Sequence, residues 1–331
     1  MKNKQKIINN LSVLIFSTLL FLTSCSANIS SDSRLTPSPV FMDLTQNPGS
    51  TKVTENFTQT LATKTFESKS KTEITISTPT AKLILISNEW MELPAVPTSI
   101  SQKTLEIYSF GREKRNNPYS FSVVGDCESS PSWFLGDFDK NQNHYDLGQY
   151  KYLETVINAF QGSFSRKSLA VGNGYNSASI LSPFWSDPEF CEPGETPLDC
   201  EIRNHHPSFV FILLGTNDIY NIETFEINMR TIISTLIDEG IVPIVATKAD
   251  NLEGNNKINE IISTLSYEYD IPLWNFWQAV QPLSNHGLQD DHAHLTWANN
   301  DFSNPASMDK AWPWRNLTAL QILDLLLESV Q

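Results

Sequence analysis

The chain has 331 residues, and its 37 Asp and Glu outnumber its 23 Lys and Arg, which gives a formal net charge of −14. This balance argues against a nucleic-acid binder, because such proteins need a basic face for the phosphate backbone. With 40% hydrophobic residues the chain is too apolar to be wholly disordered, and it is long enough for one sizeable core with additional segments.

The first 24 residues have the pattern of a signal peptide. Three lysines lie within the first six residues, and the uncharged apolar stretch 11–22 is too short to remain as a membrane-spanning helix. The following sequence, Leu22-Thr23-Ser24-Cys25, resembles the lipobox of bacterial lipoproteins, in which the cysteine is lipidated. We therefore expect Cys25 to carry a lipid that anchors the protein outside the cytoplasm, on a bacterial membrane.

Composition divides the rest of the chain into three parts. Residues 25–80 are rich in Ser and Thr without a persistent helical or strand period, which predicts a disordered tether. Residues 81–118 mix apolar residues with prolines, and we expect them to pack on the domain as an extension. Leu105, Ile107 and Phe110 lie in a mixed segment, 105–110, that is too short to distinguish a strand from a helix. Residues 119–331 form the predicted domain.

Strand-like and helix-like segments alternate along this domain. Continuous apolar runs predict buried strands over 121–124, 209–214, 241–246 and 271–277. A weaker strand candidate lies at 168–171. Apolar residues at helical spacing predict helices over 149–160, 222–239, 256–267 and 317–330. Uniformly apolar strands that alternate with helices predict a three-layer α/β/α fold with a mostly parallel sheet, whose chemistry lies in the loops at the carboxyl ends of the strands.

Four short polar sequences lie at such strand ends or in a late loop. They are Gly125-Asp126-Cys127, Gly172-Asn173-Gly174, Gly215-Thr216-Asn217-Asp218 and Asp291-His292-Ala293-His294. Their order resembles that of the SGNH (GDSL-type) hydrolases, which carry Gly-Asp-Ser, a glycine in a second block, Gly-x-Asn-Asp and Asp-x-x-His. The resemblance covers the chain from about residue 119 to its end, and it departs from the family at Cys127, where the family has its nucleophilic serine.

The resemblance implies a role for each motif residue. Cys127 would be the nucleophile, His294 the base and Asp291 the group that orients the imidazole. The backbone N–H groups of Cys127 and Gly174 and the side-chain amide of Asn217 would form the oxyanion hole, with Gly172 as the alternative to Gly174. The remaining motif residues that would support the site are Gly125, Asp126, Gly215 and Asp218.

The other cysteines leave Cys127 as a thiol. Cys191 and Cys200 bracket a short polar loop, and an exported protein lies where disulfides persist, so we predict a Cys191–Cys200 disulfide. A rival pairing of Cys127 with either loop cysteine would block catalysis.

The motifs favour a membrane-anchored hydrolase that cleaves an ester or thioester on a small molecule or a polysaccharide, with no cofactor and no metal. Three alternatives stay open. Cys127 could be a structural thiol in a carbohydrate- or lipid-binding relative without activity. The same residues would support acyl transfer to an acceptor other than water. His292 and His294, beside Asp290 and Asp291, could bind a metal.

Overall fold

The computed structural model describes residues 89–331, except for the side chain of Gln142. The predicted signal peptide, the lipidation site Cys25, the whole predicted tether and the first eight residues of the predicted extension, 81–88, lie outside these residues. Within residues 89–331, no helix is both long and apolar enough to cross a membrane.

A four-stranded sheet forms the centre of the described part of the chain. Its strands lie in the order β1 (Asn117–Gly125), β3 (Pro207–Leu213), β4 (Val242–Ala246) and β5 (Leu273–Trp274), and all neighbours are parallel. Every residue of β3 and β4 is buried, as expected for strands covered on both faces. The predicted fold class, a mostly parallel α/β fold, is confirmed.

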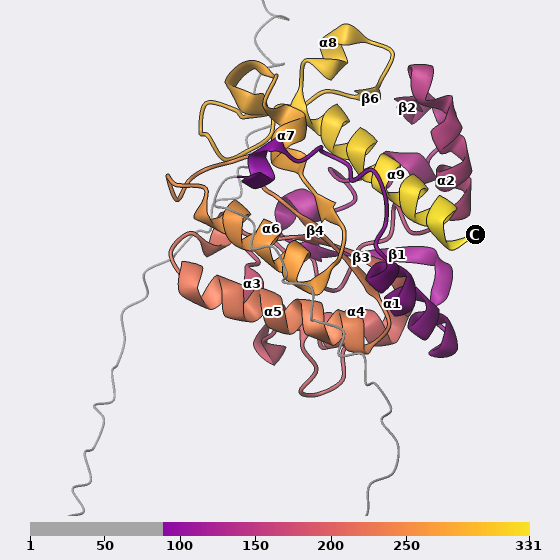
Figure 1. Cartoon of the computed structure of the whole chain (residues 1–331), viewed down its shortest axis with the longest axis vertical. Coiled ribbons are helices and arrows are strands. Elements are labelled where there is room, and N and C mark those ends of the chain that lie inside the picture. Colours follow the sequence, from indigo (N-terminus) through magenta and orange to yellow (C-terminus); the bar gives the residue numbers. More distant parts are fainter. Residues whose placement is uncertain (1–88) are drawn as a thin grey trace, which may run out of the picture. The chain divides into compact units, whose positions relative to one another are not determined.

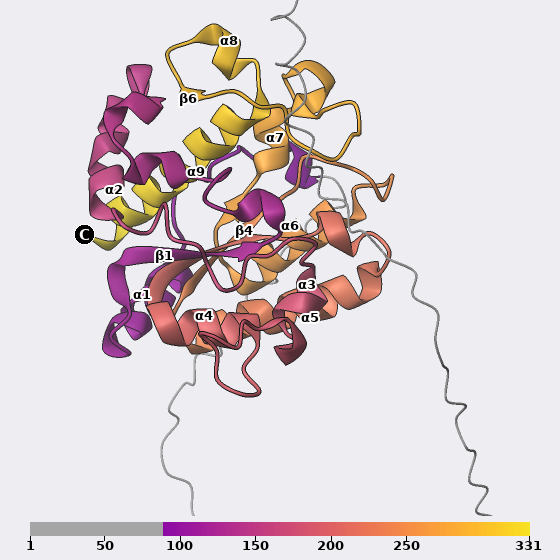
Figure 2. The same ribbon diagram turned by 180° about the vertical axis from the view of Figure 1, so that it is seen from behind.

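Helices cover both faces of this sheet, which gives three layers (Figures 1 and 2). One layer contains α3 (Ser177–Ile180), α4 (Pro197–His205), α5 (Ile222–Asp238) and α6 (Lys257–Tyr269). The other contains α2 (Glu154–Ala159), α7 (Phe276–Val280) and the long α9 (Ala311–Val330).

Smaller elements complete the fold. The helix α1 (Gln102–Glu113) precedes β1, and α8 (Pro305–Met308) precedes α9. Two short strands, β2 (Tyr145–Asp146) and β6 (Asn300–Asp301), form a separate parallel pair. Short 3-10 helices lie at η1 (Glu89–Glu92), η2 (Cys127–Ser129), η3 (Gly136–Asp139), η4 (Gln142–His144), η5 (Gly148–Leu153), η6 (Pro183–Trp185), η7 (Thr216–Asp218) and η8 (Ser284–Gly287).

Several predicted elements differ from the observed ones. The segment 168–171 is not a strand, because only Val171 forms a bridge, to Gly125. The strand predicted over 271–277 is reduced to β5, because Asn275 leaves the sheet and its side chain caps α7 by accepting from the backbone N–H of Gln278.

The predicted helices also differ in their boundaries. The helix predicted over 149–160 is divided into η5 and α2, with non-helical backbone at Tyr150. The last helix begins at Ala311, six residues before the prediction. It tolerates Pro313 because the first N–H groups of a helix have no partner within it. The undecided run 105–110 lies inside α1, whose first turn is capped by the Ser101 hydroxyl.

Candidate active site

The first two motifs meet at the carboxyl end of β1. Gly125, the last residue of β1, pairs with Leu213 at the end of β3. Its backbone N–H donates to the carbonyl of Ala170 at 3.1 Å, and its carbonyl accepts from the N–H of Gly172 at 3.3 Å. These bonds bring the loop that contains Gly172 and Gly174 against the turn that begins at Asp126.

The third motif joins the second through its two polar side chains. The Asn217 amide donates to the carbonyl of Tyr175 at 3.0 Å. The buried Asp218 carboxylate accepts from the Ser177 hydroxyl at 2.6 Å and from its backbone N–H at 3.0 Å. Gly174 and Asn217, two of the candidate oxyanion donors, therefore lie on loops that are hydrogen-bonded to each other. Asp218 makes part of this connection.

Two glycines in these loops have conformations that favour glycine. Gly174 has φ +71°, and a Cβ atom built on it would have no neighbour within 4 Å, so its backbone faces open space where a ligand can approach. Gly215 has φ +130°, and a Cβ there would lie 2.7 Å from the Ile258 side chain. Of the two alternatives left by the sequence, Gly174 has the open backbone that an oxyanion donor needs, whereas a Cβ on Gly172 would meet the ring of Tyr175.

His294 and Asp291 form a hydrogen-bonded pair in the loop before β6. The Nδ1 atom of His294 lies 2.5 Å from Oδ2 of Asp291, while Oδ1 of the same carboxylate accepts the backbone N–H groups of Ala293 and His294, each at 3.0 Å. The carboxylate thus fixes both the loop and the ring. Because the pair uses Nδ1, the Nε2 atom of His294 lies on the opposite side of the ring from Asp291.

This pairing changes the pKa of both groups. The hydrogen bond that the ring donates to Asp291 raises the pKa of His294 above its usual value, and the carboxylates of Glu128 and Asp126 add to the increase against the effect of burial. For Asp291, burial favours the neutral acid, but hydrogen bonds from the His294 ring and from the loop backbone outweigh it and lower the pKa to about 2. The aspartate is therefore ionised throughout the pH range in which the histidine titrates.

Cys127 is half-buried and opens the 3-10 turn η2. The Asp126 side chain caps this turn by accepting the backbone N–H of Glu128 at 3.0 Å. Cys191 and Cys200 form a disulfide with each other, as predicted, so neither is bonded to Cys127. The rival pairing is excluded.

Glu128 and Arg315 are further charged residues of the site, and no sequence motif predicted either of them. The Oε1 atom of Glu128, the residue after Cys127, accepts the backbone N–H of Leu295, the residue after His294, at 3.2 Å. Arg315, buried on α9, lies 3.6 Å from Oε2 of Glu128 and donates to the carbonyl of Glu128 at 3.3 Å. Glu128 therefore links the turn of the candidate nucleophile to the loop of the candidate base.

The environment of Arg315 confirms that it is held in place. Its guanidinium lies over the rings of Trp312, Phe134 and Phe276, at 5.0, 5.2 and 5.9 Å from their centroids. No local sequence signal marks such a residue, because an arginine inside a helix is usually a solvent-exposed surface residue.

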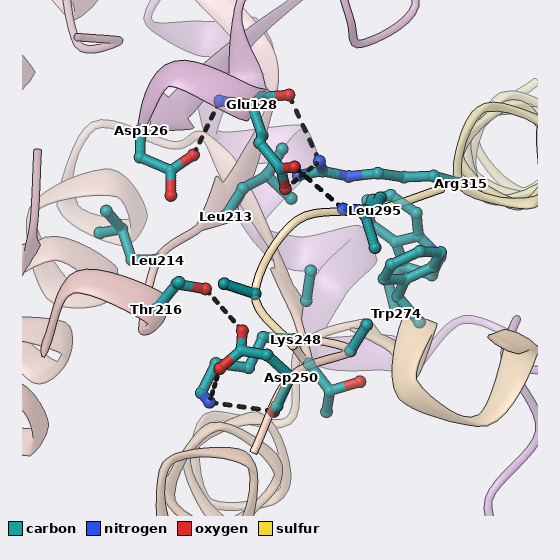
Figure 3. A pocket seen from close by; sticks show the side chains of 15 residues that line it. Asp126, Glu128, Leu213, Leu214, Thr216, Lys248, Asp250, Trp274, Leu295 and Arg315 are labelled. Atoms are coloured by element: carbon teal, nitrogen blue, oxygen red, sulfur yellow. Dashed lines mark hydrogen bonds and ion pairs between the residues drawn. The ribbon is translucent and has the colours of Figure 1, made fainter. Parts of the chain in front are cut away.

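A small cavity of about 40 Å³ lies between these charged groups, at the carboxyl ends of the strands. Figure 3 shows Asp126, Glu128 and Arg315 on one side of it and Lys248 and Asp250 on the other. Burial, followed by the charge of Glu128, raises the pKa of Asp126 to about 7. The cavity has room for only a few water molecules, and Cys127 is not among the residues that line it.

The far side of the cavity supports the Asn217 loop. The buried Lys248 ammonium lies 2.6 Å from both Asp250 and Glu253, and Asp250 in turn accepts the hydroxyl of Thr216 at 2.7 Å. This network fixes Thr216, which immediately precedes Asn217 in η7.

The alternative of a metal at His292 and His294 gains no geometric support. Within residues 89–331, one group of three His, Cys, Asp or Glu residues has its ligand atoms within 4.8 Å of one another, and it consists of Cys191, Glu195 and Cys200. Its two sulfur atoms form the disulfide.

The chain is similar to several solved structures. A GDSL-like lipase from Bacteroides thetaiotaomicron is 14% identical, with 69% of this chain and 99% of that chain covered and a TM-score of 0.41. The psychrotrophic esterase EstA from Pseudoalteromonas sp. is 15% identical, with 61% and 98% covered and a TM-score of 0.37. No family model and no curated protein matches the chain.

Proposed function

We propose that the protein is an ester or thioester hydrolase of the SGNH type, with Cys127 as nucleophile, His294 as base and Asp291 as the orienting carboxylate. The observation that carries the proposal is the Asp291–His294 pair, whose loop is tied by the Glu128–Leu295 hydrogen bond to the turn that contains Cys127. Nucleophile, base and orienting group are the three parts that acyl transfer requires.

In the first half of the reaction, Nε2 of His294 takes the thiol proton while Sγ of Cys127 attacks the carbonyl carbon of the substrate. The carbonyl oxygen becomes an oxyanion, which the N–H groups of Cys127 and Gly174 and the amide of Asn217 would stabilise. The Asn217 amide has two N–H bonds, and the one bonded to Tyr175 orients the other.

The intermediate then collapses. The C–O bond, or C–S bond in a thioester, breaks, and the leaving group takes the proton from His294. This leaves an acyl thioester on Cys127. Water then attacks this thioester while His294 removes its proton, and the proton returns to the departing thiolate as the free acid is released.

The charges around Cys127 act in opposite directions. Asp126 and Glu128 flank the thiol, and negative charge opposes formation of a thiolate. Arg315 interacts electrostatically with Cys127 and with both acids, and its positive charge favours the thiolate. The raised pKa of Asp126 means that this carboxyl is partly neutral near pH 7, which weakens the repulsion.

The test follows hydrolysis of p-nitrophenyl acetate by wild type, Cys127→Ala and Cys127→Ser between pH 5 and 9. We expect hydrolysis by wild type, loss of at least about 100-fold in Cys127→Ala, and an acylated Cys127 in mass spectra of quenched reactions. An inactive wild type together with an active Cys127→Ser would contradict the proposal and favour a binding protein. Equal activity in wild type and Cys127→Ala would also contradict it.

We also propose that a lipid on Cys25 holds the enzyme on a membrane outside the cytoplasm. The support is the sequence that precedes this cysteine, which resembles a lipobox. Cys25→Ser should release the protein from washed membranes, and a variant that stays bound after a salt wash would contradict lipid anchoring.

A further inference from the structure

A second and larger cleft is lined by residues that follow Cys127 and His294 closely in the sequence, and the proposed mechanism does not use it. Its volume is about 710 Å³, within the range of about 300–1,000 Å³ that small-molecule sites span. Three segments line it, within 132–137, 143–154 and 297–301. The last segment begins three residues after His294, and the first begins five residues after Cys127.

The floor of the cleft is fixed by buried amides. The side-chain amide of Asn300, in β6, donates to Asp137 at 2.8 Å and accepts from the amide of Asn316 at 2.9 Å. Asn316 lies on α9 and also accepts the backbone N–H of Leu135 at 2.9 Å. β2 and β6, which lie side by side in Figure 1, are thus held to α9 by hydrogen bonds beneath the cleft. A preformed floor of this kind favours binding, because these side chains are already ordered and lose little conformational entropy when a ligand binds.

Aromatic surface is exposed on the walls. Trp297 lines the cleft and is 59% exposed, which is unusual for so large an apolar side chain. Tyr145 also lines it and is half-buried, with its ring 5.0 Å from that of Phe138. Flat aromatic faces of this kind pack well against the C–H face of a sugar ring.

The remaining lining is polar and carries an excess of negative charge. Exposed side chains that can hydrogen-bond include Asn143, His144 and Asn299. Asn provides both donors and acceptors, which suits the hydroxyl groups of a sugar.

Charge and composition exclude other ligand classes. Four carboxylates, Asp137, Asp146, Glu154 and Asp301, face one lysine, Lys151. That excess disfavours nucleic acids, phosphorylated ligands and uronic-acid polymers. A long hydrocarbon chain would find little apolar surface besides the two aromatic rings.

We propose that this cleft binds a neutral oligosaccharide chain, and that the substrate of the enzyme is an O-acylated neutral polysaccharide whose sugar backbone lies over Trp297 while the acyl group reaches Cys127. The assignment of the substrate rests on the proposed function; the assignment of the cleft as a glycan site does not.

The first experiment measures binding without catalysis. The full chain with Cys127→Ala is titrated calorimetrically with four unmodified neutral oligosaccharides, the hexamers of cellulose, xylan, mannan and chitin, and with the hexamer of polygalacturonate. We expect at least one neutral hexamer to bind, and Trp297→Ala to weaken its binding by about tenfold or more. Trp297→Phe, which keeps an aromatic face, should restore part of the affinity.

Tyr119→Ala is the matched control, because Tyr119 is a 54% exposed aromatic in β1. It lies six residues before Gly125, about 20 Å along the strand from the candidate site. The Tyr119→Ala variant should bind the neutral hexamer with the same affinity as the Cys127→Ala parent. The inference is overturned if no neutral hexamer binds, if polygalacturonate binds more tightly than all of them, or if Trp297→Ala and Tyr119→Ala have the same effect.

A second experiment separates this inference from the proposed function. The chain with its native Cys127 is assayed on p-nitrophenyl acetate and on the acetylated form of the oligosaccharide that binds. Trp297→Ala should raise KM for the acetylated oligosaccharide, and its loss of kcat/KM there should exceed its loss on the small ester by about tenfold. Binding without any ester hydrolysis would remove the proposed function and keep the glycan site. Hydrolysis of both esters with no selective effect of Trp297→Ala would keep the proposed function and remove the glycan site.

Discussion

The protonation of His294 decides when the proposed mechanism can operate, because the imidazole must be neutral to accept the thiol proton. The hydrogen bond that His294 donates to Asp291 raises the pKa of His294, so the neutral form is lost at a higher pH than for an ordinary histidine. Activity should therefore fall as the solution is acidified through that raised pKa.

Asp291→Asn tests this relation. Without the carboxylate charge, the pKa of His294 falls, so the acid limb of the kcat/KM profile should move to lower pH. The plateau should also drop by about 10²–10⁴-fold, because the ring is no longer held in the correct tautomer. Profiles of p-nitrophenyl acetate hydrolysis between pH 5 and 9 measure both effects. An acid limb at the wild-type position would show that Asp291 does not set the pKa of the base.

Asp126 links protonation to stability. Its pKa in the folded chain, about 7, is higher than the unfolded value of 3.8, so the folded state favours the protonated acid. This contribution is fully present below the unfolded pKa and is lost as pH rises through the folded pKa. Asp126→Asn can still cap η2 and does not ionise.

We therefore expect Asp126→Asn to be more stable than wild type at pH 8, by on the order of 1–3 kcal/mol, and equal to it near pH 4. Urea unfolding across this range measures the difference. Asp309→Asn, at an exposed aspartate, controls for the loss of one negative charge. A stability difference that does not change with pH would be inconsistent with a raised pKa at Asp126.

At the scale of elements, the Glu128–Arg315 contact connects η2, the His294 loop and α9. The guanidinium is buried, so removing the charge of Glu128, its nearest acidic partner, leaves it poorly compensated. Glu128→Gln should lower the free energy of unfolding by about 2–4 kcal/mol. The substitution should also lower kcat more than a substitution elsewhere that causes an equal loss of stability. The reason is that Glu128 bonds to the backbone of Leu295, the residue next to the candidate base His294.

A double-mutant cycle with Arg315→Met checks the link between the two side chains. Chemical unfolding of the two single variants and the double variant should give a coupling energy above about 1 kcal/mol. Additive effects of the two substitutions would mean that the ion pair does not hold these elements together.

The disulfide acts on α4, which carries Cys200 and the buried Glu201. Glu201 accepts from Ser122 of β1 at 2.5 Å and from Arg166 at 2.7 Å, so α4 is bonded to the first strand. Replacing both Cys191 and Cys200 by serine should lower the free energy of unfolding by about 2–3 kcal/mol, as expected for a cross-link that closes a short loop. Thermal unfolding with and without reductant measures this, and a wild type whose Tm is insensitive to reductant would contradict it.

Across the described residues as a whole, the segment before α1 belongs to the core. Trp90 in η1 is 2% exposed and lies edge-on to Trp277 at 5.1 Å, and the side chain of Asn275 donates to its carbonyl at 2.8 Å. Trp90→Ala should lower the free energy of unfolding by about 3–5 kcal/mol. Trp185→Ala, at a tryptophan that is 45% exposed, should cost far less. Similar unfolding curves for the two variants would show that the segment contributes little to stability.

Several features of the fold could be predicted from local patterns of residues. The uninterrupted apolar runs of β3 and β4 identify strands buried on both faces, and the periodic pattern of α5 gives its bounds to within a residue. Asp291 and His294 could be proposed as a pair because three residues separate them, and Cys191 and Cys200 because they enclose a short loop.

Features that depend on contacts between residues far apart in the sequence could be identified only from the folded structure. The segment 168–171 meets β1 at a single bridge, and β5 ends where Asn275 bonds to the carbonyls of Trp90 and Leu93. Glu128 and Leu295 are 167 residues apart, and the buried charge of Arg315 interacts with the acids Glu128 and Asp126 and lies over three aromatic rings from other segments. Hydrophobic periodicity records whether a side chain is buried, but it carries no information about the side chain's partner.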